Sequence, residues 1–334
     1  MSKVAFIPKE KIGKLPKVMA SFGLERFRGK EVLVKLHMGE KGNKWYVDPA
    51  IVKVVCDELK KVDAKPSLFD TVSAYRGGRD TKEKYMKTAK SHGFDKVGCP
   101  IVIGNEGPNV SIDGKKFEVA KELLNSKFIV AISHVKGHPI PGMGAAIKNF
   151  GMGGLSNSSK SFIHDGGKPI IDKSKCQLCG TCEKVCISDH VYGKKAIKVS
   201  DEWCIEYGCC MGCGHCVKEC PYGALSYKID DFNLLLAMGA KACVQNKNLL
   251  YINVALKITK FCDCHVDSLP IISEDVGILV SNDPVSIDAA SVDLVEKKMG
   301  KTFGDVWGAD AMGQVRCAEK IGMGSAKYEL IKVK

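Results

Sequence analysis

The sequence predicts an α/β fold, a mostly parallel sheet covered by helices, with a small cysteine-rich segment inserted into it. Over residues 1–168, short β-type runs alternate with helical patterns. This alternation is typical of a parallel sheet with right-handed crossovers. It returns over residues 229–334, whereas closely spaced cysteines dominate residues 169–228. We therefore expect one α/β domain that begins before the insertion and is completed after it; two separate α/β lobes are the alternative.

Strand and helix signals follow one another in the first part of the chain. Asp48 and Pro49 supply an N-cap and a first-turn proline, and the apolar residues of IVKVVCDEL (residues 51–59) give the helix after them one buried face. Residues 128–133, FIVAIS, form a wholly apolar strand of the kind buried inside a parallel sheet. The other strands predicted here are residues 31–37, 67–70 and 100–104.

The last part of the chain uses the same signals. Residues 249–254 and 276–281 are predicted strands. Asp283 and Pro284 repeat the cap-plus-proline start of a helix, and apolar residues at roughly helical spacing follow until Gly300.

Length and composition favour a globular protein with a sizeable core. The chain has 334 residues, of which 45% are hydrophobic and 26% charged, and this balance excludes global disorder. No apolar run approaches the roughly 18 residues of a membrane helix. The N-terminal sequence MSKVAFIPKE contains too short an apolar stretch for a signal peptide. We expect a soluble cytoplasmic protein without a membrane span.

The net charge of +12 is unevenly distributed. Residues 1–168 carry +13, residues 169–228 carry +1 and residues 229–334 carry −2. A basic first part favours an anionic small-molecule substrate or an acidic protein partner, although a lysine-rich solvated surface explains it equally well. Nucleic acid is not the expected partner, because aromatic residues make up only 7% and no recognition motif appears.

The cysteine pattern carries the strongest chemical signal. Ten of the sixteen cysteines lie within residues 176–220, and eight of these form two runs of spacing C-x-x-C-x-x-C-x-x-x-C. In two-cluster ferredoxins the fourth cysteine of each run ligates the other cluster. We therefore expect an inserted α+β ferredoxin-like domain with two [4Fe–4S] clusters. The predicted ligands are Cys176, Cys179, Cys182 and Cys220 for cluster 1, and Cys210, Cys213, Cys216 and Cys186 for cluster 2.

Structural zinc is the competing interpretation of these cysteines. Zinc sites generally use two well-separated C-x-x-C pairs, not four cysteines within eleven residues, repeated. Two details depart from the ferredoxin pattern: Ile187 stands where the first run would have proline, and Cys209 lies beside Cys210. Cys209 and Cys204 are left open as free thiols, substitute ligands or small buried residues.

A second chemical site is predicted at the carboxyl ends of the strands, where open α/β sheets bind ligands. His134 follows the apolar strand 128–133, and His37 and Asp70 end their own strands. His138 lies four residues after His134. We treat His134 and His138 as candidate catalytic or metal-binding residues; histidines bonded to loop backbone are the alternative.

Two glycine-rich stretches extend this candidate site. Residues 142–149, GMGAAIKN, lack the third glycine of a dinucleotide fingerprint, so nicotinamide binding is not supported. An anion-binding loop with Lys148 as a third candidate catalytic residue remains open beside simple tight turns. Arg76 and Arg79 are placed to clamp a carboxylate or phosphate, or to lie on a solvated loop.

The segment Cys262-Asp263-Cys264-His265 places two thiols on one side of an extended chain. Cys262 and Cys264 are therefore candidates for an additional metal or a third cluster. A redox-active pair and ordinary buried cysteines are the other interpretations.

Four stretches together resemble a known family, the domain of unknown function 362, in the version that carries an inserted two-cluster ferredoxin module. The resemblance covers nearly the whole chain. It implies a redox-active iron–sulfur protein in a cytoplasmic, often anaerobic setting, and it assigns no reaction. The stretches are DTVSAYRGGRDT (residues 70–81), SHVKGHPIPGMGAAIKNFGMGG (133–154), FCDCHV (261–266) and DVGILVSNDPVSIDAASVDL (275–294).

The sequence thus favours an electron-transfer protein or oxidoreductase that passes electrons from two clusters to a site in the α/β domain. That site would contain His134, His138, Lys148 and the Cys262–Cys264 segment. The alternative is a non-catalytic accessory protein that delivers electrons or clusters to a redox partner protein through its basic half.

Overall fold

An eight-stranded sheet forms the centre of the molecule in a computed structural model, which describes residues 1–334 except for the side chains of residues 190 and 191. Seven strands run in one direction, and only β15 runs against its two neighbours. The fold is therefore α/β with a mostly parallel sheet, as predicted. In spatial order the strands are β16 (Tyr328–Lys332), β1 (Ser2–Pro8), β15 (Gly277–Ser281), β14 (Asn248–Ala255), β7 (Phe128–His134), β2 (Glu31–Lys35), β3 (Lys65–Thr71) and β4 (Ile101–Gly104).

The parallel strands β14, β7, β2 and β3 bring their carboxyl ends to one edge of the sheet. Val254 lies opposite His134 in the pairing of β14 with β7, and Lys35 lies opposite Phe69 in the pairing of β2 with β3. Side chains that end these strands therefore meet there, although they are far apart in sequence.

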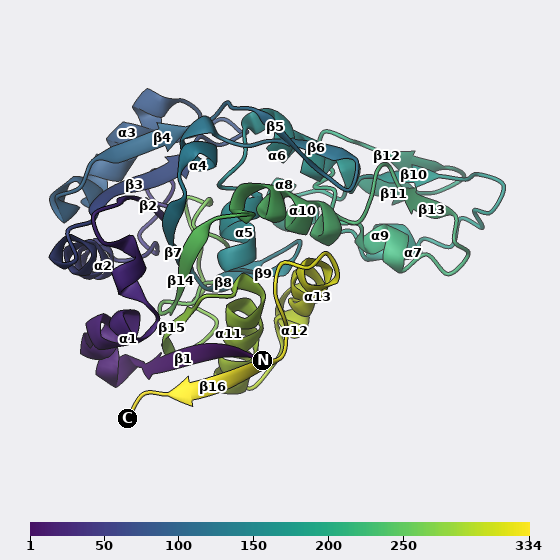
Figure 1. The fold of residues 1–334 in the computed structure, drawn as a ribbon. Coiled ribbons are helices and arrows are strands. Elements are labelled where there is room, and N and C mark those ends of the chain that lie inside the picture. The colour runs from purple at the N-terminus through teal and green to yellow at the C-terminus, as the bar shows by residue number, and fades with distance from the viewer.

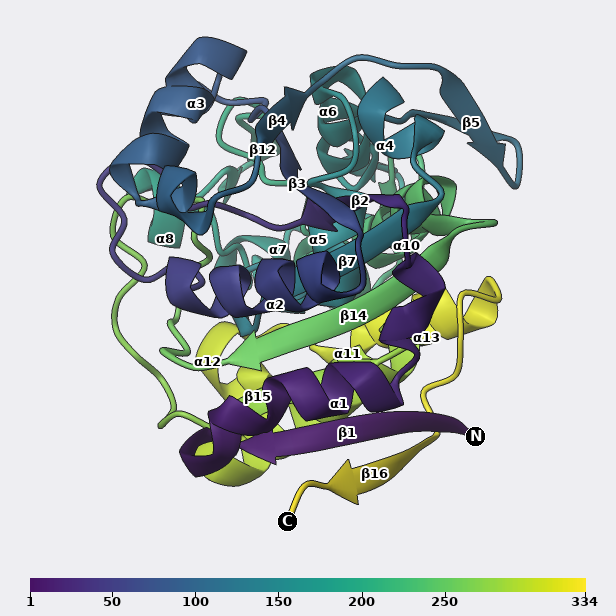
Figure 2. The ribbon, with the colours of Figure 1, turned by 60° about the vertical axis from the view of Figure 1, so that its left-hand side comes forward.

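Helices cover both faces of the sheet, and alternate strand residues supply the two cores. Val130 and Ile132 of β7 point into one core, whereas Ile129 and Ala131 point into the other. Figure 2 shows α1 and α2 in front of the sheet and α11 and α13 behind it. The first layer contains α1 (Leu15–Ser21), α2 (Pro49–Lys61), α3 (Lys82–Ser91) and the 3₁₀ helices η1 (Lys9–Lys14), η2 (Leu24–Phe27) and η3 (Phe94–Val97).

The second layer carries the helices that lie nearest the inserted segment. It packs through α5, α10 and α11 in particular, whose buried residues belong to one continuous core with the sheet. Its members are α4 (Lys121–Asn125), α5 (Ala146–Gly151), α6 (Asn157–Gly166), α10 (Phe232–Val244), α11 (Pro284–Met299), α12 (Phe303–Trp307) and α13 (Met312–Lys320).

The predicted helix starts are confirmed by the caps. The Asp48 carboxylate accepts the backbone N–H of Ala50 at 2.8 Å, and the Asp283 carboxylate accepts that of Val285 at 2.8 Å. The strand β1 and its neighbour, the edge strand β16, were not among the strands predicted from sequence. Their signal is weak because β16 is mostly exposed and lacks a continuous apolar run.

Two short hairpins of the α/β body lie outside the main sheet. One is formed by β5 (Asn109–Ile112) and β6 (Lys115–Glu118). The other, formed by β8 (Lys136–His138) and β9 (Gly142–Gly144), follows β7 directly and is buried. This second hairpin carries His138 and leads into α5, the helix of Lys148.

The cysteine-rich segment projects from the body as a separate small unit (Figure 1). Its first strand, β10, pairs antiparallel with its last strand, β13. The chain therefore leaves and re-enters the body at neighbouring points, which is the geometry of an insertion. Its elements are β10 (Pro169–Ile171), α7 (Thr181–Lys184), α8 (Asp189–Tyr192), β11 (Ile197–Val199), β12 (Trp203–Ile205), α9 (His215–Lys218) and β13 (Leu225–Tyr227).

Among the helices that the structure describes, none has both the length and the apolar character needed to cross a bilayer.

Candidate functional site

Two cysteine-lined cavities occupy the inserted segment. We call the first the outer cavity: it has about 330 Å³ of empty space, and its wall contains Trp203 and Pro221. The first three cysteines of one run meet the last cysteine of the other run there, as the crossed pattern requires. These cysteines are Cys176, Cys179, Cys182 and Cys220.

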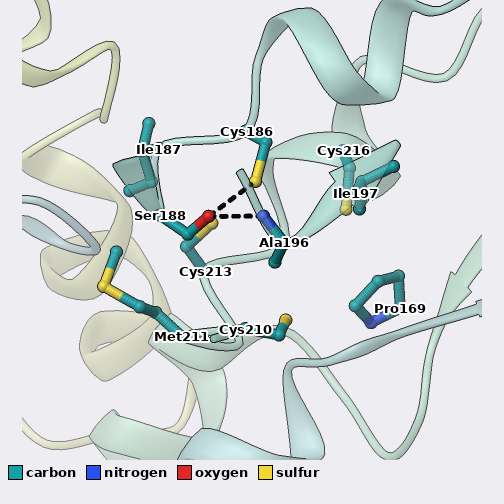
Figure 3. A pocket seen from close by; sticks show the side chains of 11 residues that line it. Pro169, Cys186, Ile187, Ser188, Ala196, Ile197, Cys210, Met211, Cys213 and Cys216 are labelled. Carbon is teal, nitrogen blue, oxygen red and sulfur yellow. Dashed lines mark hydrogen bonds between the residues drawn. The ribbon is translucent and has the colours of Figure 1, made fainter. Parts of the chain in front are cut away.

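The second cavity, the inner cavity, also has about 330 Å³ of empty space and lies against the α/β body. Its wall contains Met211, which packs against the main core of the body. Figure 3 shows the sulfur-bearing side chains around this space, with Pro169 and Ile197 closing it. Its cysteines are Cys186, Cys210, Cys213 and Cys216.

Left-handed backbone makes the tight loops possible. Gly180 and Gly214 both have φ +74° and cap the short helices α7 and α9, from which the third cysteine of each run projects. Glycine takes this conformation without a steric penalty. Each loop can therefore wrap three sulfurs around one cavity.

The thiols of the two cavities have different electrostatic surroundings. A hydrogen bond with Thr181 lowers the pKa of the exposed Cys179. Burial raises the pKa of the Cys213 thiol to about 12. Burial also opposes ionisation of Cys186, but hydrogen bonds from Ser188 and the backbone lower the pKa of this thiol. The Ser188 hydroxyl lies 3.3 Å from Cys186 Sγ and accepts the backbone N–H of Ala196 at 2.6 Å (Figure 3).

The donor set fits a cluster better than a single metal ion. A zinc ion needs its ligands to converge on one point, whereas a cubane needs four sulfurs spread around a wider space, one for each iron. Among the described residues, no three His, Cys, Asp or Glu side chains are grouped to hold one ion. The eight cysteines instead surround two cavities, four to each.

Cys204 and Cys209 line neither cavity. Cys204 is exposed on β12, and Cys209 is buried with its thiol 3.3 Å from the Glu206 carboxylate. The structure thus places both outside the crossed sets.

A buried polar cluster lies at the carboxyl ends of the strands. The Lys35 ammonium donates to Asp70 at 2.9 Å and to the Asn149 side-chain oxygen at 2.6 Å. The Tyr85 hydroxyl donates to the other oxygen of Asp70 at 2.5 Å. Burial lowers the pKa of Lys35. Sequence analysis missed Lys35, although a lysine inside an otherwise apolar strand is a signal that it could have used.

His134 is held by the protein at both ring nitrogens. Nδ1 lies 2.8 Å from the Asp263 carboxylate, and Nε2 lies 2.8 Å from the Leu256 carbonyl. Both ring nitrogens thus already have a partner within the protein. His134 offers no free nitrogen to a substrate in this arrangement, and its contacts favour a positioning role.

Asp263 is the centre of this arrangement. Its second oxygen accepts from the Lys136 ammonium at 2.7 Å. Burial would raise the pKa of Asp263, but the charges of His134 and Lys136 hold it at about 2. Neither Asp263 nor Lys136 was singled out from sequence. Alternation predicts the residue between two cysteines on one side to point to the other side, and that signal marks Asp263.

Lys148 and His138 are close enough for their charges to interact. Their proximity is seen in the electrostatics: burial lowers the pKa of His138 well below its usual value, and the charge of Lys148 lowers it further. Burial and the charge of Lys136 lower the pKa of Lys148 to about 7. Among the described residues, the Lys148 ammonium has no hydrogen-bond or ion-pair partner. It is therefore the cation of the cluster that is available to an anion.

Cys262 and Cys264 are joined by a disulfide. The prediction that both sulfurs face one side of the chain is confirmed by this bond. Sulfurs bonded to each other are not thiolate ligands, so the structure does not support the additional metal predicted here. It favours the redox-active pair.

Arg79 and Arg76 have separate environments. Arg79 is buried, and its Nε donates to Glu40 at 3.0 Å. The predicted clamp on an external anion is thus filled by an internal carboxylate. Arg76 is exposed and lines a groove beside Cys264.

The chain belongs to the family described as domain of unknown function (DUF362), which matches residues 32–293. This confirms the resemblance drawn from the four sequence stretches. The description of the family names no reaction, so it leaves the chemistry to the residues.

Two curated proteins match shorter stretches and support an inserted module of the ferredoxin type. Pyruvate synthase subunit PorD of Methanothermobacter marburgensis is 31% identical over 83 residues, which are 25% of this chain and 89% of PorD. NAD(P)H-quinone oxidoreductase subunit I of Gloeobacter violaceus is 32% identical over 66 residues. These are 18% of this chain and only 32% of that subunit.

Two solved structures are distantly similar. The lactate racemase apoprotein of Thermoanaerobacterium thermosaccharolyticum has 13% identity and a TM-score of 0.38, over 77% of this chain and 51% of that one. A protein from Thermotoga maritima has 8% identity and a TM-score of 0.41, over 93% of this chain and 59% of that one. Likenesses at this level say nothing about the reaction.

Proposed function

We propose that this chain is an iron–sulfur electron-transfer protein, in which residues 169–228 hold two [4Fe–4S] clusters that pass electrons to a site in the α/β body. The single observation that carries the proposal is the crossed arrangement of cysteines. Each of two equal cavities is lined by three cysteines of one run and the fourth of the other. A [4Fe–4S] cluster supplies one-electron transfer when bound.

The surroundings of the two cavities would then set the direction of electron transfer. The outer cavity includes the exposed Cys179, so it is the side open to a redox partner protein. The inner cavity lies against the body through Met211 and Cys213, both packed on the main core. Electrons from a partner would enter at the outer cavity and leave from the inner one. The two curated relatives, subunits of a pyruvate synthase and of a quinone oxidoreductase by name, support such a partner.

The α/β body supplies the receiving site in this proposal. His138, Lys148 and the Cys262–Cys264 disulfide lie at the sheet edge where the strands end. Their neutral imidazole and unpaired ammonium suit an anionic small molecule. His134 and Lys136 would hold the loop through their bonds to Asp263.

Metal analysis of protein purified without oxygen tests the proposal. We expect about eight irons and eight sulfides per chain, as two four-iron clusters require. Cys182→Ser should remove the outer cluster and Cys216→Ser the inner one. Cys204→Ser, an exposed cysteine outside both cavities, is the matched control and should retain all the iron. Stoichiometric zinc without sulfide would contradict the proposal.

A second candidate function is delivery of electrons to a partner enzyme without a reaction in the body. The observation that favours it is the charge of +13 on residues 1–168. An acidic partner would bind there, and its affinity would fall steeply with salt. The test compares electron transfer to such a partner by the cluster-loaded chain with transfer by its Lys148→Met and Cys262→Ser variants. Equal transfer would favour this function.

A further inference from the structure

The Cys262–Cys264 disulfide differs from every other cysteine of the chain. The other fourteen cysteines are free thiols in the structure, and eight of them line the two cavities. Cys56 and Cys99 lie close enough to hydrogen-bond and are still not joined. The pair that is joined lies at the sheet edge, beside the buried charges already described.

The two sulfurs differ in their access to solvent. Cys262 is buried, with 2% of its surface exposed, whereas Cys264 is partly exposed. Cys264 and His265 line a groove with about 1630 Å³ of open space. An incoming molecule in this groove would therefore meet Cys264 first, and Cys262 would lie behind it.

The groove carries positive charge. Lys41, Arg76 and Lys87 line it, and none of the three has a carboxylate partner among the described residues. Its one acidic residue, Glu40, is bound by Arg79 and by the backbone N–H of Gly78. An anionic molecule is the ligand that such a groove favours.

The same groove includes a residue of the inserted segment. Tyr192 ends α8, six residues after Cys186 of the inner cavity. Lys87 of α3 lines the groove with it. Inserted segment and body thus form the groove together.

A groove between the inserted segment and the body separates the inner cavity from the aromatic residues next to the disulfide. Cys186 and Trp307 line one common cavity. The Trp307 ring lies 4.9 Å from the ring of Phe261, edge to face, and Phe261 directly precedes Cys262. The aromatic pair next to the disulfide thus reaches the groove that a predicted cluster ligand also lines.

The loop that holds the disulfide is fixed on several sides. Asn43 donates to the His265 carbonyl at 2.6 Å, and the Tyr75 hydroxyl donates to the Cys264 carbonyl at 3.2 Å. The backbone N–H of Glu40 donates to the Asp263 carbonyl at 2.9 Å. These bonds do not involve sulfur, so they can persist when the S–S bond opens.

We propose that the Cys262–Cys264 disulfide is the electron acceptor of the body and that its reduced form reduces an anionic low-molecular-mass disulfide bound in the basic groove. This rests on the proposed function, because the two clusters are the electron source. The S–S bond takes up two electrons and two protons and breaks into two thiols. Each of two reduced clusters is oxidised by one electron in the process.

The second half of the cycle is thiol–disulfide exchange. The Cys264 thiolate attacks one sulfur of the bound disulfide, forms a mixed disulfide and releases the first thiol. The Cys262 thiolate then attacks Cys264 Sγ, restores the protein disulfide and releases the second thiol. One substrate disulfide becomes two thiols, with two electrons and two protons supplied.

Differential alkylation tests the first half of the cycle, in which the clusters reduce the Cys262–Cys264 disulfide. The cluster-loaded full chain is reduced with photoreduced deazaflavin, labelled with light iodoacetamide, then treated with dithiothreitol and heavy iodoacetamide. We expect light label on Cys262 and Cys264 in the loaded chain, and heavy label in the cluster-free chain treated in the same way. Equal light labelling in both chains would overturn the inference, since the reductant would then act without the clusters.

This experiment separates the two levels of the argument. If iron and sulfide analysis finds no clusters, the proposed function fails and the inference falls with it. If the clusters form and are reduced, as their spectra report, while Cys262 and Cys264 keep the heavy label, only the inference is overturned.

Trapping of the mixed disulfide tests the second half of the cycle, the thiol–disulfide exchange. In the Cys262→Ser chain, glutathione disulfide, an anionic probe, should leave one glutathione on Cys264, located by peptide mass. Cys264→Ser should leave none on the buried Cys262, and Cys204→Ser is the matched control for an exposed thiol. Adducts on Cys204 but not on Cys264 would overturn the assignment.

Charge selectivity completes the test. Arg76→Gln in the Cys262→Ser chain should slow adduct formation with glutathione disulfide about fivefold, the effect of losing one charged contact of modest strength. The neutral bis(2-hydroxyethyl) disulfide should react equally with both chains. Equal slowing of both probes would overturn the role of the basic groove.

Discussion

The outer and inner cavities are built by the same cysteine spacing but lie in different surroundings. The outer one includes the exposed Cys179 and belongs to a small core within the inserted segment. In the inner one, Met211 and Cys213 pack against the core of the body. The comparison teaches that the same spacing builds two four-cysteine cavities, whereas packing places one against the body and leaves a cysteine of the other exposed.

One position in each run shows this difference clearly. Leu178 and Gly212 both precede the second cysteine and both have left-handed backbone, with φ of +51° and +66°. Leu178 is exposed, so it keeps its side chain at the cost of backbone strain. A Cβ on Gly212 would lie 1.9 Å from the carbonyl oxygen of His164, at the end of α6. Glycine is required there because the inner loop rests directly on the body.

Substitution of the fourth cysteine of each run is the most severe test of the crossed arrangement of the two cavities. Cys186→Ser should lose the inner cluster although Cys186 belongs to the first run, and Cys220→Ser should lose the outer cluster. Each variant should retain about four of the eight irons of the two clusters. Iron analysis gives the count, and alkylation of the freed cysteines shows which cavity has been emptied. Loss of the cluster from the same run would contradict the crossed arrangement.

Gly212→Ala should weaken the contact between inner loop and body. Left-handed strain and the clash with His164 together cost about 3 kcal/mol. Gly180→Ala is the matched control, because Gly180 has φ +74° and open space around it. That control should cost only about 1 kcal/mol of strain. Unfolding midpoints of both loaded chains check the difference; equal shifts would show that the contact contributes nothing.

Thiol reactivity should separate the cavities in the cluster-free chain. Thiolate is the reactive form, so alkylation rises with pH toward the pKa of each thiol. The lowered pKa of Cys179 and the pKa of about 12 for Cys213 predict that Cys179 reacts first. At pH 8 we expect at least about a thirtyfold difference in rate, after allowance for the weaker nucleophilicity of a low-pKa thiolate. Peptide mass mapping measures both rates, and comparable rates would contradict the difference in burial.

Hydroxyl groups beside the cysteine sulfurs should change the reduction potentials of the two clusters by different amounts. Ser188 and Thr181 each lie 3.3 Å from a cysteine Sγ, in the inner and outer cavities respectively. A ligating sulfur has no proton, so we expect each hydroxyl to turn toward it as donor; Ser188 would then give up the bond that it donates to the Lys194 carbonyl at 2.9 Å. Ser188→Ala should lower the inner potential by about 40 mV, the equivalent of one hydrogen bond of about 1 kcal/mol.

Thr181→Val is the matched change in the outer cavity and should have a smaller effect, because solvent replaces the lost donor. Potentiometric titration followed by electron paramagnetic resonance resolves the two potentials. A larger shift for Thr181→Val would reverse the assignment of inner and outer.

Much of the fold could be predicted because its signals are local. Asp48-Pro49 and Asp283-Pro284 start helices through bonds within the first turn, and the apolar strand 128–133 lies inside the sheet. The edge strand β16 was not predicted, because it is held in the sheet by its pairing with β1, which is far away in the sequence. The roles of residues in the α/β site were predicted less well than the fold. His134 was taken as catalytic, but its two acceptors, Asp263 and Leu256, lie more than a hundred residues away.

The sequence by itself determined the ligand pattern, the helix starts and the parallel character of the sheet, because each depends on residues a few positions apart. Only the tertiary structure decided that the inner cavity faces the body and that the Cys262–Cys264 disulfide opens on a basic groove. It also decided that Lys35 and Lys136 are neutralised, whereas Lys148 has no carboxylate partner in the part of the chain that the structure describes. These outcomes depend on which segments the sheet and its helices bring together, and burial makes each charge depend on the partner that it meets there.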